Sequence, residues 1–185
     1  AQPYRVEEAL KLASALDLSF PAAVALVRRG INTVDAGRVF LAAEEFHDPS
    51  EFDGIDEVVR TVIEAVEAGR RITVYGDFDA DGVCSTSVMV GVLRELGADA
   101  DWFIPDRISE GYGLNPEAIR MLAARGTGLI ITVDCGIGSL VQARTARQLG
   151  LELIITDHHD FGAELPEAAA ILHPRLPARP YPFPG

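Results

Sequence analysis

The sequence has 185 residues, of which 48% are hydrophobic, and its 16 basic and 28 acidic residues give a formal net charge of −12 at pH 7. This composition excludes a disordered chain and predicts one domain with a sizeable core, with room for a small appendage. The negative charge is the opposite of the basic surface of proteins that bind nucleic acid through many phosphate contacts. Bound divalent cations and local arginines can nevertheless reverse the sign within one site.

No stretch approaches the roughly 18 uninterrupted apolar residues of a membrane span. The first residues, AQPYRVEEALKL, lack the pattern of a signal peptide. We therefore expect a cytoplasmic protein without membrane association. Its two cysteines, Cys84 and Cys135, have neither the number of a disulfide framework nor the spacing of a zinc site.

Residues 1–54 predict an N-terminal helical segment followed by a joint. Apolar residues recur at helical spacing in VEEALKLASAL, PAAVALVRR and TVDAGRVFLAA, which predicts two or three short amphipathic helices between residues 5 and 45. Gly30 ends the second stretch, and Thr33 is a candidate N-cap for the third. The joint is the turn-rich HDPSEFDG.

From residue 55 onward, helical and strand-like stretches alternate. Residues 55–69 have helical spacing and end at a glycine. We expect strands at 71–76, 100–104, 128–133, 151–156 and 168–172, and helices at 83–96, 115–125 and 139–149. This alternation predicts an α/β domain over residues 55–175, with a mainly parallel sheet of about five strands flanked by helices. Trp102 and Phe103 are expected in its core. Residues 176–185 are rich in proline and predict an extended connector.

Three acidic motifs follow predicted strands. Asp77, Asp79 and Asp81 come after the first strand, Asp134 after the third, and TDHHD, residues 156–160, after the fourth. The carboxyl ends of parallel strands share one edge of the sheet, where binding sites gather. We therefore expect the three motifs to meet, and this convergence is the main functional signal.

Such a cluster of carboxylates predicts a metal site. Alternate positions of an extended stretch share a face, so Asp77, Asp79 and Asp81 would repel one another. With Asp134 added, the cluster stays ionised only beside cations. Carboxylates with one or two imidazoles suit Mn²⁺ or Mg²⁺, and Zn²⁺ less well. So many ligands predict two ions roughly 3.5 to 4 Å apart, an arrangement that stabilises the attacking and leaving oxygens in phosphoryl hydrolysis.

Two other interpretations of the first motif fit less well. DFDADG matches the start of an EF-hand loop, but its twelfth position is Val88, where calcium requires a bidentate glutamate. DADGV resembles the haloacid-dehalogenase phosphatase motif, with Asp79 as the nucleophile. That family needs a downstream lysine, whereas the only lysine here is Lys11, and it would leave the two histidines without a role.

With YGDFDADG, VDCG and TDHH in this order, the chain resembles the DHH phosphoesterase superfamily, and within it the RecJ single-strand-specific exonucleases. IPDRISEGYGLN, residues 104–115, is similar to the arginine and glycine loop of RecJ proteins, and residues 17–41 are similar to their opening helical segment. The resemblance thus covers essentially the whole chain. Other branches carry a histidine and an NPD-type first motif, so GDFDADG favours RecJ.

The resemblance implies that Asp77, Asp79 and Asp81 belong to the first metal-binding motif. Asp134 is then the residue that bridges the two ions, and His158 is a further metal ligand.

The same resemblance implies roles for residues around the metals. His159 contacts a phosphate or stabilises developing charge, and Asp157 orients the histidines. Arg107 contacts a phosphate, with a surface salt bridge as the alternative, and Gly111 and Gly113 belong to the same substrate-binding loop. The expected catalytic residues are Asp79, Asp81, Asp134, His158 and His159.

By resemblance, the activity is that of a two-metal phosphodiesterase that cuts single-stranded DNA from the 5′ end and releases mononucleotides. DNA repair and recombination are the expected context, with a single-strand-binding protein or a helicase as partner. One alternative is a DHH phosphodiesterase of short oligonucleotides or cyclic dinucleotides, and another is a non-catalytic replication scaffold of the same fold. RecJ proteins continue into a further metal-binding aspartate and two more domains, so we expect an amino-terminal fragment with reduced activity.

Overall fold

The computed structural model describes residues 4–43, 47–109, 111–176 and 181–182. Its contacts divide the chain into two compact units, Ala1–His47 and Asp48–Gly185. The domain boundaries expected from the sequence, after residues 54 and 175, stay a prediction. Most of the expected connector, residues 177–180 and 183–185, lies outside the described residues.

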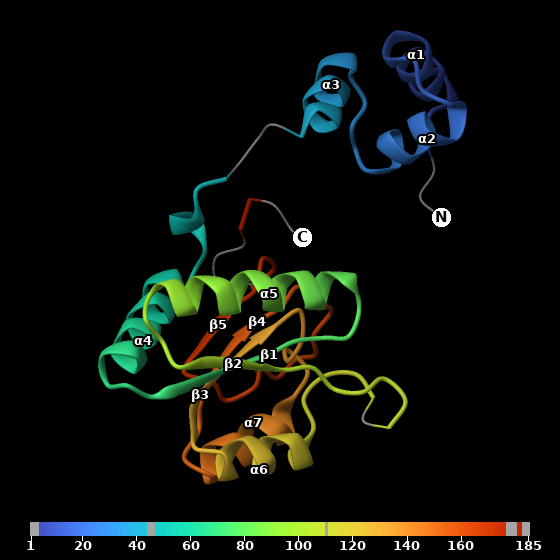
Figure 1. The fold of residues 1–185 in the computed structure, drawn as a ribbon. Helices are drawn as coiled ribbons and strands as arrows, with labels where there is room; N and C mark the ends of the chain where they lie inside the picture. Colours follow the sequence, from blue (N-terminus) through green and yellow to red (C-terminus); the bar gives the residue numbers. More distant parts are fainter. Residues whose placement is uncertain (1–3, 44–46, 110, 177–180, 183–185) are drawn as a thin grey trace. The chain divides into compact units, whose positions relative to one another are not determined.

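The described residues of the first unit form three helices: α1 (Val6–Leu16), α2 (Phe20–Arg28) and α3 (Val34–Ala42) (Figure 1). They bury a small cluster of apolar side chains that includes Leu12, Leu26 and Val27. The predicted N-cap is confirmed, because the Thr33 hydroxyl oxygen accepts a hydrogen bond from the Ala36 N–H at 3.2 Å. The amphipathic spacing in the sequence, which predicted two or three helices, therefore located all three of these helices.

The second unit is an α/β domain. After the short η1 (Pro49–Glu51), its helices are α4 (Ile55–Glu67), α5 (Ala80–Glu95), α6 (Pro116–Ala124) and α7 (Leu140–Gln148). Its strands are β1 (Arg71–Tyr75), β2 (Ala100–Phe103), β3 (Thr127–Val133), β4 (Glu152–Thr156) and β5 (Ala170–Leu172). All strand pairs are parallel, in the spatial order β2-β1-β3-β4-β5. This confirms the predicted fold class and the number of strands.

Helices cover both faces of the sheet, with α4 and α5 on one side and α6 and α7 on the other (Figure 1). Side chains of a strand alternate between faces, so Leu129 and Ile131 of β3 pack with the α4 and α5 side, and Ile130 with the α6 and α7 side. Burial on both faces explains the continuous apolar runs of the sequence.

The order of the strands creates a topological switch point at the edge where β1 and β3 end. The chain leaves β1 into α5 on one face and leaves β3 into α7 on the other. In open α/β sheets, such a change of direction is where ligands bind. Asp134 follows β3 directly and Asp77 follows β1 after Gly76, and both aspartates are buried.

One core assignment is wrong. Trp102 lies on the face of the sheet that α5 covers, as does its partner Val74, but it is 59% exposed because β2 is an edge strand. Its ring lies instead beside the Arg94 guanidinium, 5.8 Å from the ring centroid. Phe103 does pack against the core, next to Tyr75. Among the described residues, no helix has the length and apolar content needed to span a membrane.

Candidate metal centre

The first acidic motif lies between β1 and α5. Asp77 is 3% exposed, whereas Asp81 lies on the exposed first turn of α5. Asp79 is the N-cap of α5, and its Oδ1 accepts a hydrogen bond from the Gly82 N–H at 3.0 Å. A Cβ atom at Gly82 would lie 2.6 Å from the Asp77 carbonyl oxygen, so only glycine lets the helix start this close to the strand end.

Asp134 occupies the centre of the site. Its φ of 62° lies in the left-handed region, which few residues other than glycine, asparagine and aspartate adopt. The Asp134 N–H donates to the carbonyl of Thr156, the last residue of β4, at 3.0 Å, which continues the pairing of the two strands one residue past the end of β3. The backbone therefore holds this carboxylate between the first motif and the histidine loop.

The histidine loop, residues 157–160, brings two imidazoles to Asp134. His158 Nε2 lies 3.0 Å from Asp134 Oδ1 and 3.8 Å from Asp81 Oδ2. His159 Nδ1 lies 3.8 Å from Asp134 Oδ1. All three motifs predicted from the sequence thus meet at the expected edge of the sheet.

Asp157 organises this loop rather than facing the centre. Its side chain is 1% exposed and accepts hydrogen bonds from the N–H groups of Ile137 (2.9 Å), His158 (2.7 Å) and His159 (3.1 Å). It also pairs with His159 Nδ1 at 2.8 Å. Burial raises the pKa of Asp157, but these hydrogen bonds, led by the one from Ile137, outweigh burial and hold the pKa below its ordinary value.

The pKa values of two groups in the centre are raised. Burial lowers the pKa of His159, but the hydrogen bond and the charge of Asp157 outweigh it and leave the pKa above its ordinary value. The pKa of Asp134 is also raised, mainly by burial and secondly by repulsion from the Asp81 carboxylate. In the absence of cations, the Asp134 carboxylate is therefore an unfavourable charge.

The donor set fits divalent metal ions. Two oxygen atoms, Asp77 Oδ1 and Asp134 Oδ2, are buried without a hydrogen-bond partner, which is rare unless a ligand satisfies them. Ligand atoms of Asp77, Asp79 and Asp134 lie within 4.8 Å of one another, and so do those of Asp134, His158 and His159. Asp134 belongs to both groups, as expected of a bridging carboxylate.

The loop between β2 and α6 supplies a contact that the sequence did not predict. The Tyr112 hydroxyl lies 3.0 Å from His159 Nδ1 and donates to the Asp134 carbonyl at 3.4 Å. The Tyr75 hydroxyl, from the end of β1, donates to the Gly113 carbonyl at 3.1 Å. In the sequence, the tyrosine of the EGYG stretch was the only sign of this contact, and the sequence does not reveal which groups its hydroxyl approaches.

Arg107, Gly111 and Gly113, the other residues singled out in this loop, do not contact the carboxylates or the histidines in the same way as Tyr112. The Arg107 guanidinium lies 5.2 Å from the ring centroid of Phe78, the residue between Asp77 and Asp79. Gly111 and Gly113 both have φ of 79°, and no atom lies within 4 Å of a Cβ at either position. Both glycines are therefore required by the left-handed turn of the loop rather than by close packing.

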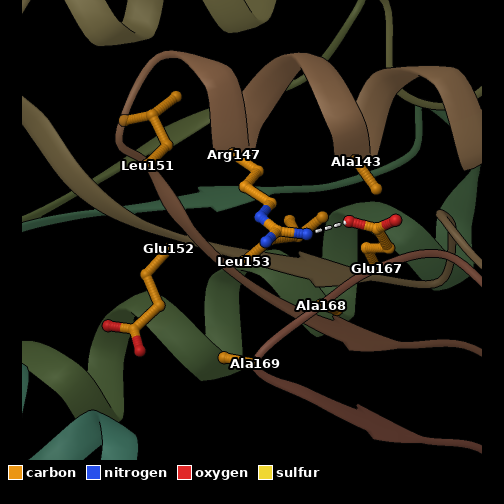
Figure 2. Close-up of a pocket in the computed structure, with 8 residues that line it drawn as sticks. All are labelled: Ala143, Arg147, Leu151, Glu152, Leu153, Glu167, Ala168 and Ala169. Carbon is orange, nitrogen blue, oxygen red and sulfur yellow. Dashed lines mark hydrogen bonds and ion pairs between the residues drawn. The ribbon is translucent and has the colours of Figure 1, made fainter.

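A pocket of about 440 Å³ lies away from the metal centre, near the start of β4 and at the opposite end of this strand from the histidine loop (Figure 2). Its charged residues are engaged in ion pairs. Arg147 pairs with Glu167, and Glu152 pairs with Arg70. This pocket therefore has no counterpart to the unsatisfied carboxylate oxygens of the metal centre.

The fold and the site define an α/β domain with a candidate metal centre, and comparisons with known proteins identify its family. Residues 71–180 match the N-terminal domain of the DHH family, and the chain belongs to this family. It is 48% identical over 160 residues to the single-stranded-DNA-specific exonuclease RecJ of Bacillus subtilis, which covers 85% of this chain and 20% of that protein. It is 45% identical over 127 residues to RecJ of Escherichia coli, covering 68% of this chain and 22% of that protein.

Solved structures show the same similarity. A crystal structure of exonuclease RecJ bound to manganese aligns with a TM-score of 0.64 and 40% identity, over 68% of this chain and 32% of that one. RecJ of Thermus thermophilus in complex with Mn²⁺ aligns with a TM-score of 0.63 and 31% identity, over 92% of this chain and 24% of that one. The chain spans about a fifth of the length of the two curated relatives.

Proposed function

We propose that the chain forms the metal-binding part of a RecJ-type phosphodiesterase that degrades single-stranded DNA from its 5′ end and releases mononucleotides. The observation that carries this proposal is the position of Asp134, which is shared by two groups of potential metal ligands. A shared carboxylate is what a two-metal hydrolytic site requires.

The two ions would have different ligands. Asp77, Asp79 and Asp134 would hold one ion, and Asp134 and His158 the other, with Asp81 beside His158. Bound Mn²⁺ or Mg²⁺ ions supply Lewis acidity and lower the pKa of coordinated water. His158 Nε2 lies 3.0 Å from Asp134 Oδ1, so the contact between these two atoms would have to give way if both bind the same cation.

His159 is suited to the phosphate rather than to a metal. Its Nδ1 is engaged by Asp157 at 2.8 Å, which leaves Nε2 as the ring nitrogen that can donate to a phosphate oxygen. Tyr112 restrains the same ring, since its hydroxyl lies 3.0 Å from Nδ1. Arg107 is the candidate cation for a neighbouring phosphate of the strand.

A pocket beside the carboxylates has room for part of a nucleotide. It has a volume of about 390 Å³, with Asp81, Asp134 and His158 among its lining residues. Phe52 and Tyr181 also line it and stack on each other with centroids 3.9 Å apart. A polar end beside an apolar end is the environment that a phosphate with an attached nucleoside requires.

The names of the relatives support the choice of substrate, since RecJ proteins are described as single-stranded-DNA-specific exonucleases. We further propose a cytoplasmic protein of DNA repair and recombination, with a single-strand-binding protein or a helicase as partner. Short oligonucleotides or cyclic dinucleotides are the alternative substrates, because the same metal centre would hydrolyse any accessible phosphodiester.

The test is release of labelled nucleotide from a 5′-labelled single-stranded oligonucleotide in the presence of Mn²⁺. The chain is compared with Asp134→Asn and with Asp35→Asn, a matched loss of one exposed carboxylate in the first unit. The proposal predicts release that EDTA and Asp134→Asn abolish and that Asp35→Asn leaves unchanged. Release that persists in Asp134→Asn would overturn the metal mechanism. Cleavage confined to dinucleotides or cyclic dinucleotides would overturn the choice of substrate, and no hydrolysis of any of these would favour the scaffold.

A further inference from the structure

The histidine loop has no regular secondary structure, yet its backbone is fixed from outside the metal centre. The segment that follows β5, residues 173–175, contacts the carbonyl groups of both His158 and His159. The side chains of the same two histidines face Asp134. One segment thus holds the peptide groups whose side chains build the site.

His173 makes the first of these contacts. It is 2% exposed and packs edge-on against the Phe161 ring, with centroids 4.7 Å apart. Its Nδ1 accepts a hydrogen bond from the Arg175 N–H at 3.1 Å, so Nδ1 must carry the lone pair. The proton therefore lies on Nε2, which donates to the His159 carbonyl at 2.8 Å.

Arg175 makes the second contact through both arms of its guanidinium. Its Nη2 donates to the His158 carbonyl at 2.6 Å, and its Nη1 donates to Asp160 Oδ1 at 2.8 Å. The Asp160 side chain is 95% exposed, and an exposed ion pair contributes little to stability. The two hydrogen bonds of Arg175 therefore matter for geometry, because they hold the His158 carbonyl in a fixed position relative to Asp160, the last residue of the loop.

The sheet gives this segment a rigid base. Thr156 of β4 pairs with Leu172 of β5, and the Asp157 N–H donates to the Leu172 carbonyl at 3.1 Å. The histidine loop and residues 173–175 therefore leave two neighbouring parallel strands side by side. The contacts between the histidine loop and residues 173–175 therefore tie the positions of the two imidazoles to the pairing of β4 with β5.

We propose that His173 and Arg175 are positioning residues that set the placement of His158 and His159 and thereby the affinity of the centre for divalent cations. This proposal rests on the proposed metal-dependent function. Residues that orient metal ligands without binding the metal themselves commonly contribute to metal affinity, and their removal weakens it by roughly 10- to 100-fold. Neither residue is assigned to the site by the sequence motifs.

The test is Mn²⁺ titration by calorimetry of the whole chain and four variants. Arg175→Gln removes the guanidinium that contacts Asp160 and the His158 carbonyl. Arg147→Gln is the matched control, since it breaks a surface ion pair at the distant pocket (Figure 2). His173→Leu removes the donor to the His159 carbonyl, and His173→Gln retains an amide donor. The thermal midpoint in EDTA is measured for each protein.

We expect Arg175→Gln to raise the Kd for Mn²⁺ about tenfold and Arg147→Gln to leave it unchanged, with similar thermal midpoints for both. His173→Leu should weaken Mn²⁺ binding more than His173→Gln does. Wild-type affinity in Arg175→Gln and His173→Leu would overturn the positioning role while leaving the proposed function intact. Absence of Mn²⁺ binding by the unmodified chain would overturn both.

The metal-free protein supplies a second readout. Long-range ¹⁵N–¹H spectra of the histidine rings should show His173 as the Nε2–H tautomer, and Arg175→Gln should shift the ring signals of His158. The Nδ1–H tautomer of His173 would contradict the hydrogen bonds on which the proposal rests.

Discussion

Among single residues, Asp134 combines several features that cost stability. Its backbone is left-handed, its carboxylate is buried, and one carboxylate oxygen lacks a partner. Burial and then Asp81 raise its pKa, so the folded state disfavours the ionised form. This penalty applies in full above the folded pKa and fades as the pH falls toward the unfolded value.

Asp134→Asn should therefore stabilise the metal-free chain at pH 7. Asparagine also tolerates the left-handed backbone, so the change removes charge without adding strain. We expect the thermal midpoint in EDTA to rise by about 2 °C or more, the change that roughly 1 kcal/mol produces in a chain of this size. Added Mn²⁺ should raise the midpoint of the wild type but not that of the variant. A variant less stable than wild type in EDTA would contradict this account of Asp134.

Asp157→Asn should have the opposite effect and destabilise the metal-free chain. Burial raises the pKa of Asp157, but hydrogen bonds from Ile137, His158 and His159 hold it below the ordinary value. A lowered pKa stabilises the fold above the unfolded pKa of about 3.9, and this stabilisation is lost as the pH falls through the folded pKa. We expect a loss of about 1 to 3 kcal/mol at pH 7, because buried N–H groups lose a charged acceptor.

Urea unfolding in EDTA at pH 7 and pH 3 measures this effect. The difference in unfolding free energy between wild type and Asp157→Asn should shrink at the lower pH. An equal difference at both pH values would show that the Asp157 charge is not the stabilising feature.

The strand-end rule found the carboxylates and histidines of the centre because it needs only the order of strands and polar residues. It did not reveal that Asp157 would accept three backbone N–H groups, or that Tyr112 would reach His159. Those contacts depend on how separate loops converge in space. Trp102 was misplaced for a related reason, since an edge strand and a central strand have similar local sequences.

At the scale of elements, the junction of β1 with α5 determines the first acidic motif. The helix begins at Ala80, three residues before the expected start, because Asp79 caps it. Two glycines of this helix differ in surroundings. A Cβ at Gly82 would lie 2.6 to 2.7 Å from backbone atoms of Asp77, whereas a Cβ at Gly91 would have no atom within 4 Å.

Gly82→Ala and Gly91→Ala therefore form a matched pair within one helix. Alanine at position 91 should stabilise the chain by up to about 1 kcal/mol, because it favours the helix over the unfolded state. Alanine at position 82 should destabilise it and weaken Mn²⁺ binding, since α5 must move away from Asp77. Chemical denaturation and calorimetry measure the two effects. Equal effects of both substitutions would show that the close approach is unimportant.

At the scale of the whole molecule, the candidate metal centre belongs to one unit. Its carboxylates and histidines all lie in Asp48–Gly185, and so do both clusters that form the core of the sheet. The first unit has an apolar cluster of its own, made by α1, α2 and α3 with the turns that flank them. Amphipathic spacing predicted its helices without any knowledge of the second unit.

A polypeptide of residues 48–185 should consequently fold and bind Mn²⁺ with an affinity within about twofold of the whole chain, as a unit with its own core does. Circular dichroism and calorimetry test this prediction. A folded but metal-free product would show that the first unit contributes to the centre.

In the proposed function, Asp134 joins two metal ions in one centre. Electron paramagnetic resonance of the chain with two equivalents of Mn²⁺ tests it directly, because ions roughly 3.5 to 4 Å apart are spin-coupled. We predict the multiline signal of a coupled pair in the wild type, and its loss in Asp134→Asn. A six-line signal of isolated Mn²⁺ in the wild type at saturating metal would contradict the two-metal account.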